Sequence, residues 1–160
     1  MARNPGSHRQ ESNEERVDRN LLELLNELRV ALPGVQVLFA FLLVVPFNQR
    51  FVATSGLQRG IYFVTLLLTA AASVFLIAPS VHHRLLFRLQ KKERVVVVAN
   101  RLSLIGVALL ALAMTGVVLF VADFVFDDRV AVLVTLCVAA LFAGIWYVIP
   151  LRHRSRRDSA

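Results

Sequence analysis

Four long apolar stretches dominate the hydropathy pattern of the chain, and none of them contains Asp, Glu, Lys or Arg. The stretches are Val30–Phe47, Ile61–Val81, Leu102–Ala122 and Val130–Ile149, each 18 to 21 residues long. Because an α-helix rises about 1.5 Å per residue, helices of this length match the hydrocarbon thickness of a bilayer. The pattern therefore predicts an all-α integral membrane protein, a four-helix bundle with these stretches as its spans.

A shorter amphipathic segment, Asp18–Ala31, precedes the first apolar stretch. Its leucines recur every three or four positions, at Leu21, Leu24, Leu25, Leu28 and Leu32. This spacing predicts an N-terminal amphipathic juxtamembrane helix, which either lies on the membrane surface or continues into the first span. We expect a break or a sharp kink at Pro33, because proline lacks an amide hydrogen and disfavours helical backbone in the residue before it.

The composition divides the chain into three parts. Residues 1–17 form a polar tail that has nothing to bury and is predicted to be disordered. Residues 18–150 form the membrane domain, and residues 151–160 form a basic tail. The hydrophobic fraction of 57% and the mean hydropathy of +0.64 exceed those of an ordinary soluble domain. The single cysteine, Cys137, excludes an intramolecular disulfide.

The positive charge of the chain alternates between the segments that flank the spans. Fifteen of the 18 Lys and Arg residues lie before the first span, between the second and third spans, or after the fourth. Only two lie in residues 48–60 and one in residues 123–129. Since Lys and Arg stay on the cytoplasmic side during insertion, both termini are predicted to be cytoplasmic in an inner (plasma) membrane. The membrane topology alone accounts for the net charge of +7, so nucleic acid is not an expected partner.

The basic loop between the second and third spans interleaves apolar residues with cations. Its cations include Arg84, Arg88, Lys91 and Lys92. The loop either forms a short surface helix whose cations contact anionic lipid headgroups, or is a solvated segment that only fixes the topology. The lipid bilayer, with its anionic headgroups, is the expected partner in the first case.

Polar side chains within the spans are hydroxyls and one amide. Thr65, Thr69 and Ser73 follow one another at four-residue spacing and form a line along one face of the second span. They either flank a narrow polar path or, as we favour, bond to the carbonyl four residues back or across a helix contact. Gln36 cannot satisfy its amide within its own helix, and a contact with another span or with headgroups is favoured over a ligand site.

The fourth span carries small residues at the spacing of a helix contact, namely Ala139, Ala140, Ala143 and Gly144. Small residues let two helix backbones approach closely. This face is expected to pack against another helix, either within the chain or in a homo-oligomer or complex with another membrane protein.

Acidic residues near a span edge are the only candidates for ion chemistry. Asp123 is a candidate cation site, whereas Asp127 and Asp128 are better placed to cap the fourth span. No motif for a metal, a cofactor or catalysis is found, so the sequence predicts a protein that is not an enzyme.

Several short segments resemble a known family of small, uncharacterised bacterial four-span membrane proteins. The matching segments are Glu27–Arg29, Pro33–Gln36, Phe39–Leu42, Gln49–Phe51, Ile77–Pro79, His83–Arg88 and Ala99–Arg101. The resemblance spans roughly Leu21 to Pro150 and implies a bacterial inner-membrane protein of unknown function. Members are often loosely labelled sodium:proton antiporter-like, but such exchange normally requires a titratable carboxylate within a span.

Two functions remain open on the sequence. The favoured one is a non-catalytic membrane component that acts through helix packing and contacts with lipids or partner proteins. The other is a small oligomeric transporter of ions or solutes, because four short spans enclose little room for a pathway in a single copy.

Overall fold

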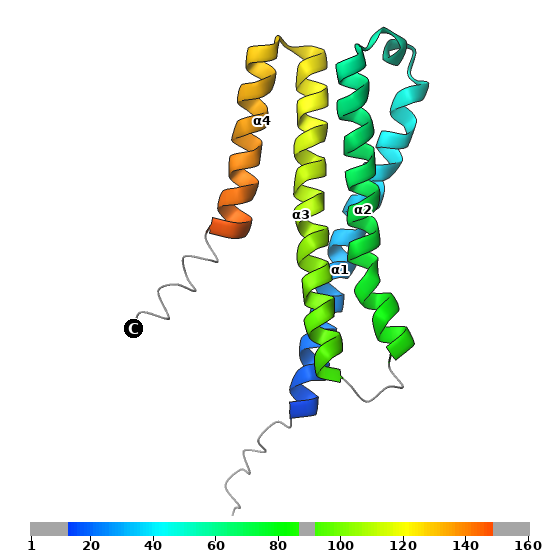
Figure 1. The fold of residues 1–160 in the computed structure, drawn as a ribbon, viewed down its shortest axis with the longest axis vertical. Coiled ribbons are helices and arrows are strands. Elements are labelled where there is room, and N and C mark those ends of the chain that lie inside the picture. Colours follow the sequence, from blue (N-terminus) through cyan, green and yellow to red (C-terminus); the bar gives the residue numbers. More distant parts are fainter. Residues whose placement is uncertain (1–12, 87–91, 149–160) are drawn as a thin grey trace, which may run out of the picture.

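The computed structural model describes residues 13–86 and 92–148, which form four α-helices connected by short turns (Figure 1). The helices are α1 (Asn13–Val44), α2 (Gly56–Leu86), α3 (Lys92–Val125) and α4 (Asp128–Ala143). Two short 3₁₀ helices, η1 (Val45–Phe47) and η2 (Gln49–Ala53), connect α1 to α2, and α4 continues into a π-helical turn, η3 (Gly144–Val148). No strand occurs in the described ranges, and the predicted all-α four-helix bundle is confirmed.

Four helical segments are long and apolar enough to cross a membrane, one for each α-helix, and those of α1 and α4 include residues of η1 and η3. These segments are Leu22–Phe47, Gly56–Val81, Val97–Val125 and Asp128–Trp146. All four begin earlier than the charge-free stretches, because each helix already includes a charged position before its stretch, at Arg29, Arg59, Arg101 and Arg129. Arginine is tolerated at such positions because its long side chain reaches the polar interface. The composition and length of the four segments indicate a membrane protein.

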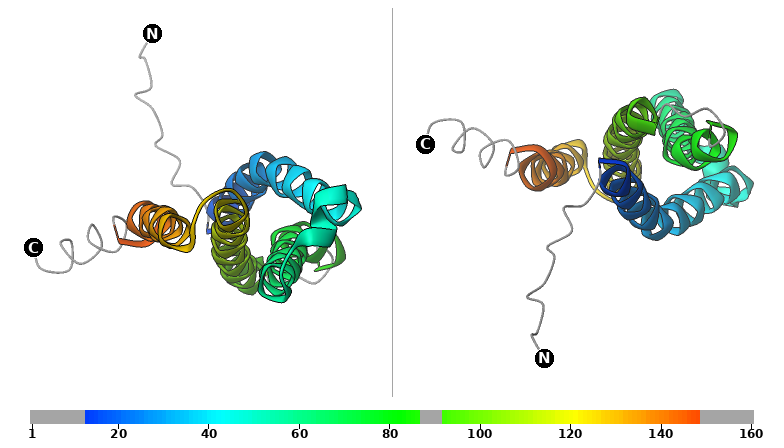
Figure 2. Two further views of the ribbon diagram at one scale, coloured as in Figure 1. Left: turned by 90° about the horizontal axis from the view of Figure 1, so that it is seen from above. Right: turned by 90° about the horizontal axis from the view of Figure 1, so that it is seen from below.

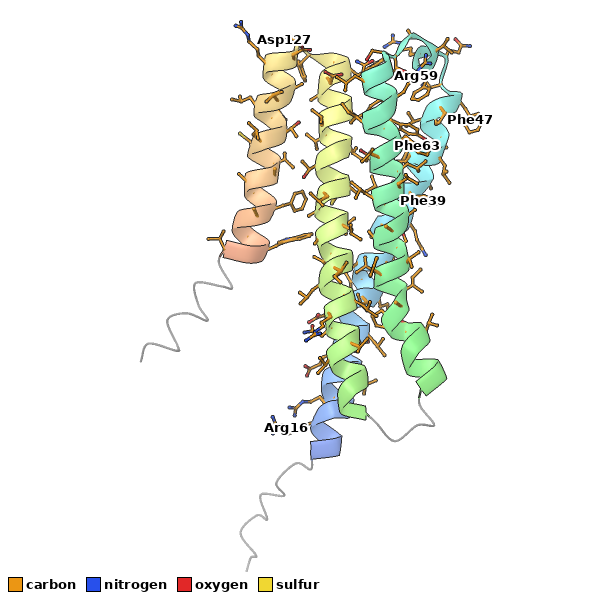
Figure 3. All side chains as sticks on the ribbon, viewed as in Figure 1. Arg16, Phe39, Phe47, Arg59, Phe63 and Asp127 are labelled. Atoms are coloured by element: carbon orange, nitrogen blue, oxygen red, sulfur yellow. The ribbon has the colours of Figure 1, made fainter. Side chains whose placement is uncertain are left out.

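Helices α1, α2 and α3 pack together as a three-helix unit, and α4 stands beside α3 alone (Figure 2). Ala131 is the only buried residue that α4 contributes. The turns between α1 and α2 and between α3 and α4 lie at one end of the bundle, which we call the short-loop end. Arg59 and Asp127 mark this end, and Arg16 marks the opposite, basic end (Figure 3).

Helix α1 is continuous through Pro33, so the expected break is not found. Leu28 and Val35 lie on either side of the proline and are both buried in one cluster with Leu76 of α2. Because residues seven apart share a face only on a continuous helix, their common contact with Leu76 favours an unbroken α1. Leu24, Leu28 and Leu32 thus pack onto the other helices as part of a continuous α1, which does not form a separate surface helix. Helix α1 also begins at Asn13, within the tail that was expected to be disordered.

The closest helix contact lies between α2 and α3 and depends on two glycines. A Cβ atom at Gly106 would lie 2.8 Å from Cγ and Cδ2 of Leu76, and a Cβ atom at Gly116 would collide with Oγ1 of Thr65. Ala99 and Ala113 of α3 are also fully buried. Small residues on α3 therefore let its backbone approach α2 more closely than a larger side chain would permit.

Candidate functional site

The line of hydroxyls on α2 lies in the contact between α2 and α3. Thr65 donates to the carbonyl of Ile61 at 2.7 Å, Thr69 to that of Thr65 at 2.9 Å, and Ser73 to that of Thr69 at 2.9 Å. Thr65 is 2% exposed and Thr69 is fully buried. Each hydroxyl hydrogen is therefore used within α2, as in the second of the two interpretations considered for this line.

Gln36 lies apart from this line. It is exposed on α1, next to the buried Val35, and faces away from the three-helix unit. Within residues 13–86 and 92–148 its amide has no hydrogen-bond partner. The structure of a single chain therefore does not bring Gln36 together with Thr65, Thr69 and Ser73, and an amide near the middle of a span is available to a helix of another membrane protein.

Two of the four cations proposed to contact lipid headgroups lie in helices at the basic end. Arg84 lies in the last turn of α2, and Lys92 is the first residue of α3. Arg88 and Lys91 lie outside the described residues, as do most of the polar tail and the basic tail at residues 151–160.

Asp123 is half-buried at the short-loop end and connects α3 to α2. Its Oδ2 atom accepts a hydrogen bond from Nε2 of Gln58 at 2.9 Å. Gln58 also forms a reciprocal pair with Ser55, since Ser55 N donates to Gln58 Oε1 and Gln58 N donates to Ser55 Oγ. This Ser-x-x-Gln arrangement is a capping box that satisfies free amides at the start of α2. Asp123 therefore has a structural contact with the helix cap.

The other two acids of the short-loop end are exposed and take a smaller part in the fold. Asp127 occupies the N-cap position of α4, and its carbonyl accepts the amide of Ala131 at 3.0 Å. Its side chain makes no capping hydrogen bond. Asp128 lies in the first turn of α4, where a negative charge is favourable beside the free amides.

Two arginines of the short-loop end, Arg50 in η2 and Arg59 at the start of α2, have different roles. Arg59 donates from Nη2 to the carbonyl of Val52 at 3.0 Å and from Nε to Oγ1 of Thr54 at 3.3 Å, so it fixes the end of η2 to α2. The guanidinium of Arg50 is exposed and has no hydrogen-bond or ion-pair partner among the residues that the structure describes. Arg50 is therefore a free cation beside a membrane-spanning unit.

A cavity of about 300 Å³ opens beside Arg50 at the short-loop end. Its lining combines apolar side chains with a few polar groups, from Val45, Asn48, Arg50, Phe51, Thr54, Phe120 and Phe124. Sequence reasoning missed this cavity because the two halves of its wall, Val45–Thr54 and the α3 phenylalanines, are about seventy residues apart. The Ser-x-x-Gln capping box was also missed, although its spacing was visible in the sequence.

The fold and these sites define the class of the protein as a four-helix membrane bundle. Helices α2 and α3 pack closely, and the hydroxyls between them donate within α2. A cavity with apolar and polar lining opens at one end of the bundle. The chain belongs to a family of unknown function, DUF6328, whose family model matches residues 10–150. This match confirms the resemblance to an uncharacterised family. No curated protein and no solved structure matches the chain.

Proposed function

We propose that the protein is a non-catalytic, multi-pass component of a bacterial inner membrane that acts through helix packing and through contacts with lipids or partner proteins. The hydroxyl line of α2 carries this proposal. Thr65, Thr69 and Ser73 are the polar groups best placed to form a path, and each hydroxyl donates within α2. Transport requires groups that can exchange partners with a passing ion or solute. These hydroxyls already donate hydrogen bonds to carbonyls of α2 and pack against α3. They therefore support the packing of the two helices, not the passage of an ion or solute.

The large exposed apolar surface of the bundle supports the same function. Only 28% of the most apolar window of the α2 span is buried within the chain, and only 6% of that of α4. In a membrane this surface contacts lipid tails or other membrane helices, because no water is present to cover it. A membrane component that acts by binding lipids or other membrane proteins would use these contacts.

The cytoplasmic location proposed for both termini rests on the distribution of charge over the fold. The start of α1, the end of α2 and the start of α3 share the basic end, whereas the short-loop end has few cations (Figure 1). The rule that positive residues remain in the cytoplasm then places the short-loop end in the periplasm.

The alternative function, a small oligomeric transporter, would depend on Asp123. This carboxylate lies at the edge of the α3 span, and one of its oxygens accepts a hydrogen bond from Gln58. An ion site there would need further ligands, which a second copy of the chain would have to supply.

A flux measurement with the purified protein tests the proposed function. The protein is reconstituted alone in liposomes with a trapped pH dye, and a sodium gradient is applied. We expect no sodium-dependent proton movement above that of protein-free liposomes, because the charge-free stretches of the four spans contain no titratable carboxylate. Exchange that Asp123→Asn abolishes would overturn the proposal and identify the ion site. Exchange that survives this substitution would overturn it as well, in favour of a path lined by hydroxyls.

A further inference from the structure

The cavity at the short-loop end lies where α1 diverges from α3 (Figure 2). In the N-terminal and middle part of α1, Leu28 and Val35 pack against Leu76 of α2 and near Val107 and Leu110 of α3. At the short-loop end, α1 lies against α2, where the hydroxyl of Tyr62 donates to the carbonyl of Leu42 at 2.9 Å. The space that α1 leaves beside α3 is the cavity between Val45 and the side chains of Phe120 and Phe124.

The walls of the cavity are apolar, and its mouth carries hydrogen-bond donors. Phe51, Phe120, Phe124 and Val45 provide the walls. The Oδ1 atom of Asn48 already accepts the backbone amide of Arg50 at 3.0 Å, so the amide hydrogens of the Asn48 side chain remain for a ligand.

Charge at the mouth favours a negatively charged ligand. Arg50 has no acidic partner within the described ranges, and the nearest carboxylate considered above, that of Asp123, is hydrogen-bonded to Gln58. Another arginine of this end, Arg59 at the start of α2, already donates to Val52 and Thr54. Arg50 therefore presents an uncompensated guanidinium, whose planar set of donors suits a phosphate or carboxylate group.

We propose that this cavity binds an anionic amphiphile, with its phosphate or carboxylate on Arg50 and Asn48 and its apolar chain against Val45, Phe120 and Phe124. A volume of about 300 Å³ accommodates a headgroup and the first part of a chain, and the remaining chain lies in the bilayer. The proposal names a ligand class for the lipid contacts of the proposed function. It does not depend on the absence of transport, because the flux measurement and the binding measurement are independent.

Native mass spectrometry of the purified full chain in neutral detergent tests this binding. The probe is short-chain phosphatidylglycerol, and phosphatidylcholine with the same chains is the comparison. We expect one phosphatidylglycerol to bind in preference to phosphatidylcholine, and Arg50→Gln to weaken its binding roughly tenfold or more, as for the loss of a charge-assisted hydrogen bond. The matched control is Arg129→Gln, which removes an exposed charge at the same end but away from the cavity lining. It should leave the affinity unchanged.

Two further measurements distinguish the contribution of the headgroup to binding from that of the acyl chain. Phe124→Ala shortens the apolar wall and keeps Arg50, so it should weaken phosphatidylglycerol binding even if Arg50→Gln does not fold. Glycerol phosphate, which has no chain, should bind far more weakly than phosphatidylglycerol. Oleate distinguishes a fatty acid from a phospholipid as the source, according to which binds more tightly. Equal binding of the two phospholipids, no effect of Arg50→Gln on a folded protein, or glycerol phosphate bound as tightly as the lipid would overturn the proposal.

Discussion

Tyr62 supplies a hydrogen bond that the backbone of α1 cannot make for itself. The carbonyl of Leu42 would normally accept the amide four residues later, but that residue is Pro46, which has no amide hydrogen. The hydroxyl of Tyr62 donates to this carbonyl instead. The tyrosine ring also contacts Phe51 and Phe120, with centroids 5.2 and 5.9 Å away. A single side chain of α2 thus connects the end of α1, the η2 turn and α3.

Tyr62→Phe should destabilise the bundle by about 1 kcal/mol, because the buried carbonyl of Leu42 loses its donor while the ring contacts remain. Thermal unfolding in detergent measures the change. Phe63→Tyr is a useful control, since Phe63 is 56% exposed on the same helix and should tolerate a hydroxyl. An unfolding midpoint of Tyr62→Phe equal to that of the wild type would show that the hydrogen bond contributes nothing.

Gly116→Ala should destabilise the contact between α2 and α3. The added methyl group would collide with Thr65, whose hydroxyl is held by the carbonyl of Ile61 and cannot turn away without losing that bond. Overpacking of this kind costs about 1–3 kcal/mol, against a gain of about 1 kcal/mol in helix propensity.

The control for this substitution is Gly144→Ala, because no atom lies within 4 Å of the Cβ that it adds. We expect its unfolding midpoint in detergent to equal that of the wild type or exceed it. A Gly116→Ala protein as stable as Gly144→Ala would mean that the two helices separate easily at this point.

At the scale of the helices, the sequence predicted the number, class and approximate bounds of the spans because lipid imposes a simple requirement of length and apolar composition. It did not predict which small residues make the close contact. The spacing of Ala140 and Gly144 on α4 favoured a helix contact, yet Ala140 is exposed and Gly144 has open space around it in a single chain. The glycines in contact, Gly106 and Gly116, are ten residues apart on α3. Their importance depends on Leu76 and Thr65 of a different helix, and no local spacing reveals such a pairing.

The small face of α4 is therefore available to a second copy of the chain or to another membrane helix. Replacing both Ala140 and Gly144 with leucine should leave the unfolding of the single chain nearly unchanged, because the added side chains enter open space. We expect crosslinking in the membrane to show a dimer of the wild type and its loss in the double variant, since larger residues prevent close approach of helices. A crosslinked dimer retained by the variant would show that this face contacts lipid.

For the whole molecule, the start of α1, the end of α2 and the start of α3 lie at one end, and the connections that follow α1 and α3 lie at the other. The sequence could predict this because consecutive membrane spans run in opposite directions. The cavity at the short-loop end could not be predicted in the same way. Its walls come from η1, η2 and α3, and its position depends on the point at which α1 diverges from α3.

The predicted orientation can be measured with reporter fusions. A reporter fused after residue 160 should report the cytoplasm, and one inserted within residues 48–60 should report the opposite side, because 15 of the 18 Lys and Arg residues flank the cytoplasmic ends. A second insertion, within residues 123–129, should agree with that in residues 48–60. A periplasmic reporter after residue 160 would reverse the proposed orientation or change the number of spans.

The position of α4 beside α3 alone has a mechanical consequence. Of the four helices, α4 has the smallest share of its span buried, and in the described structure it packs against no helix other than α3. A force that pulls the C-terminal end out of the bilayer would therefore break the α3–α4 contact first and extract α4 as a separate step. Extraction of α1, α2 and α3 would require a higher force, because the core that they share must come apart as one cooperative unit. The chain thus combines a three-helix unit with a fourth helix, α4. The contact of α4 with α3 could be replaced by a contact with another helix while α1, α2 and α3 stay packed together.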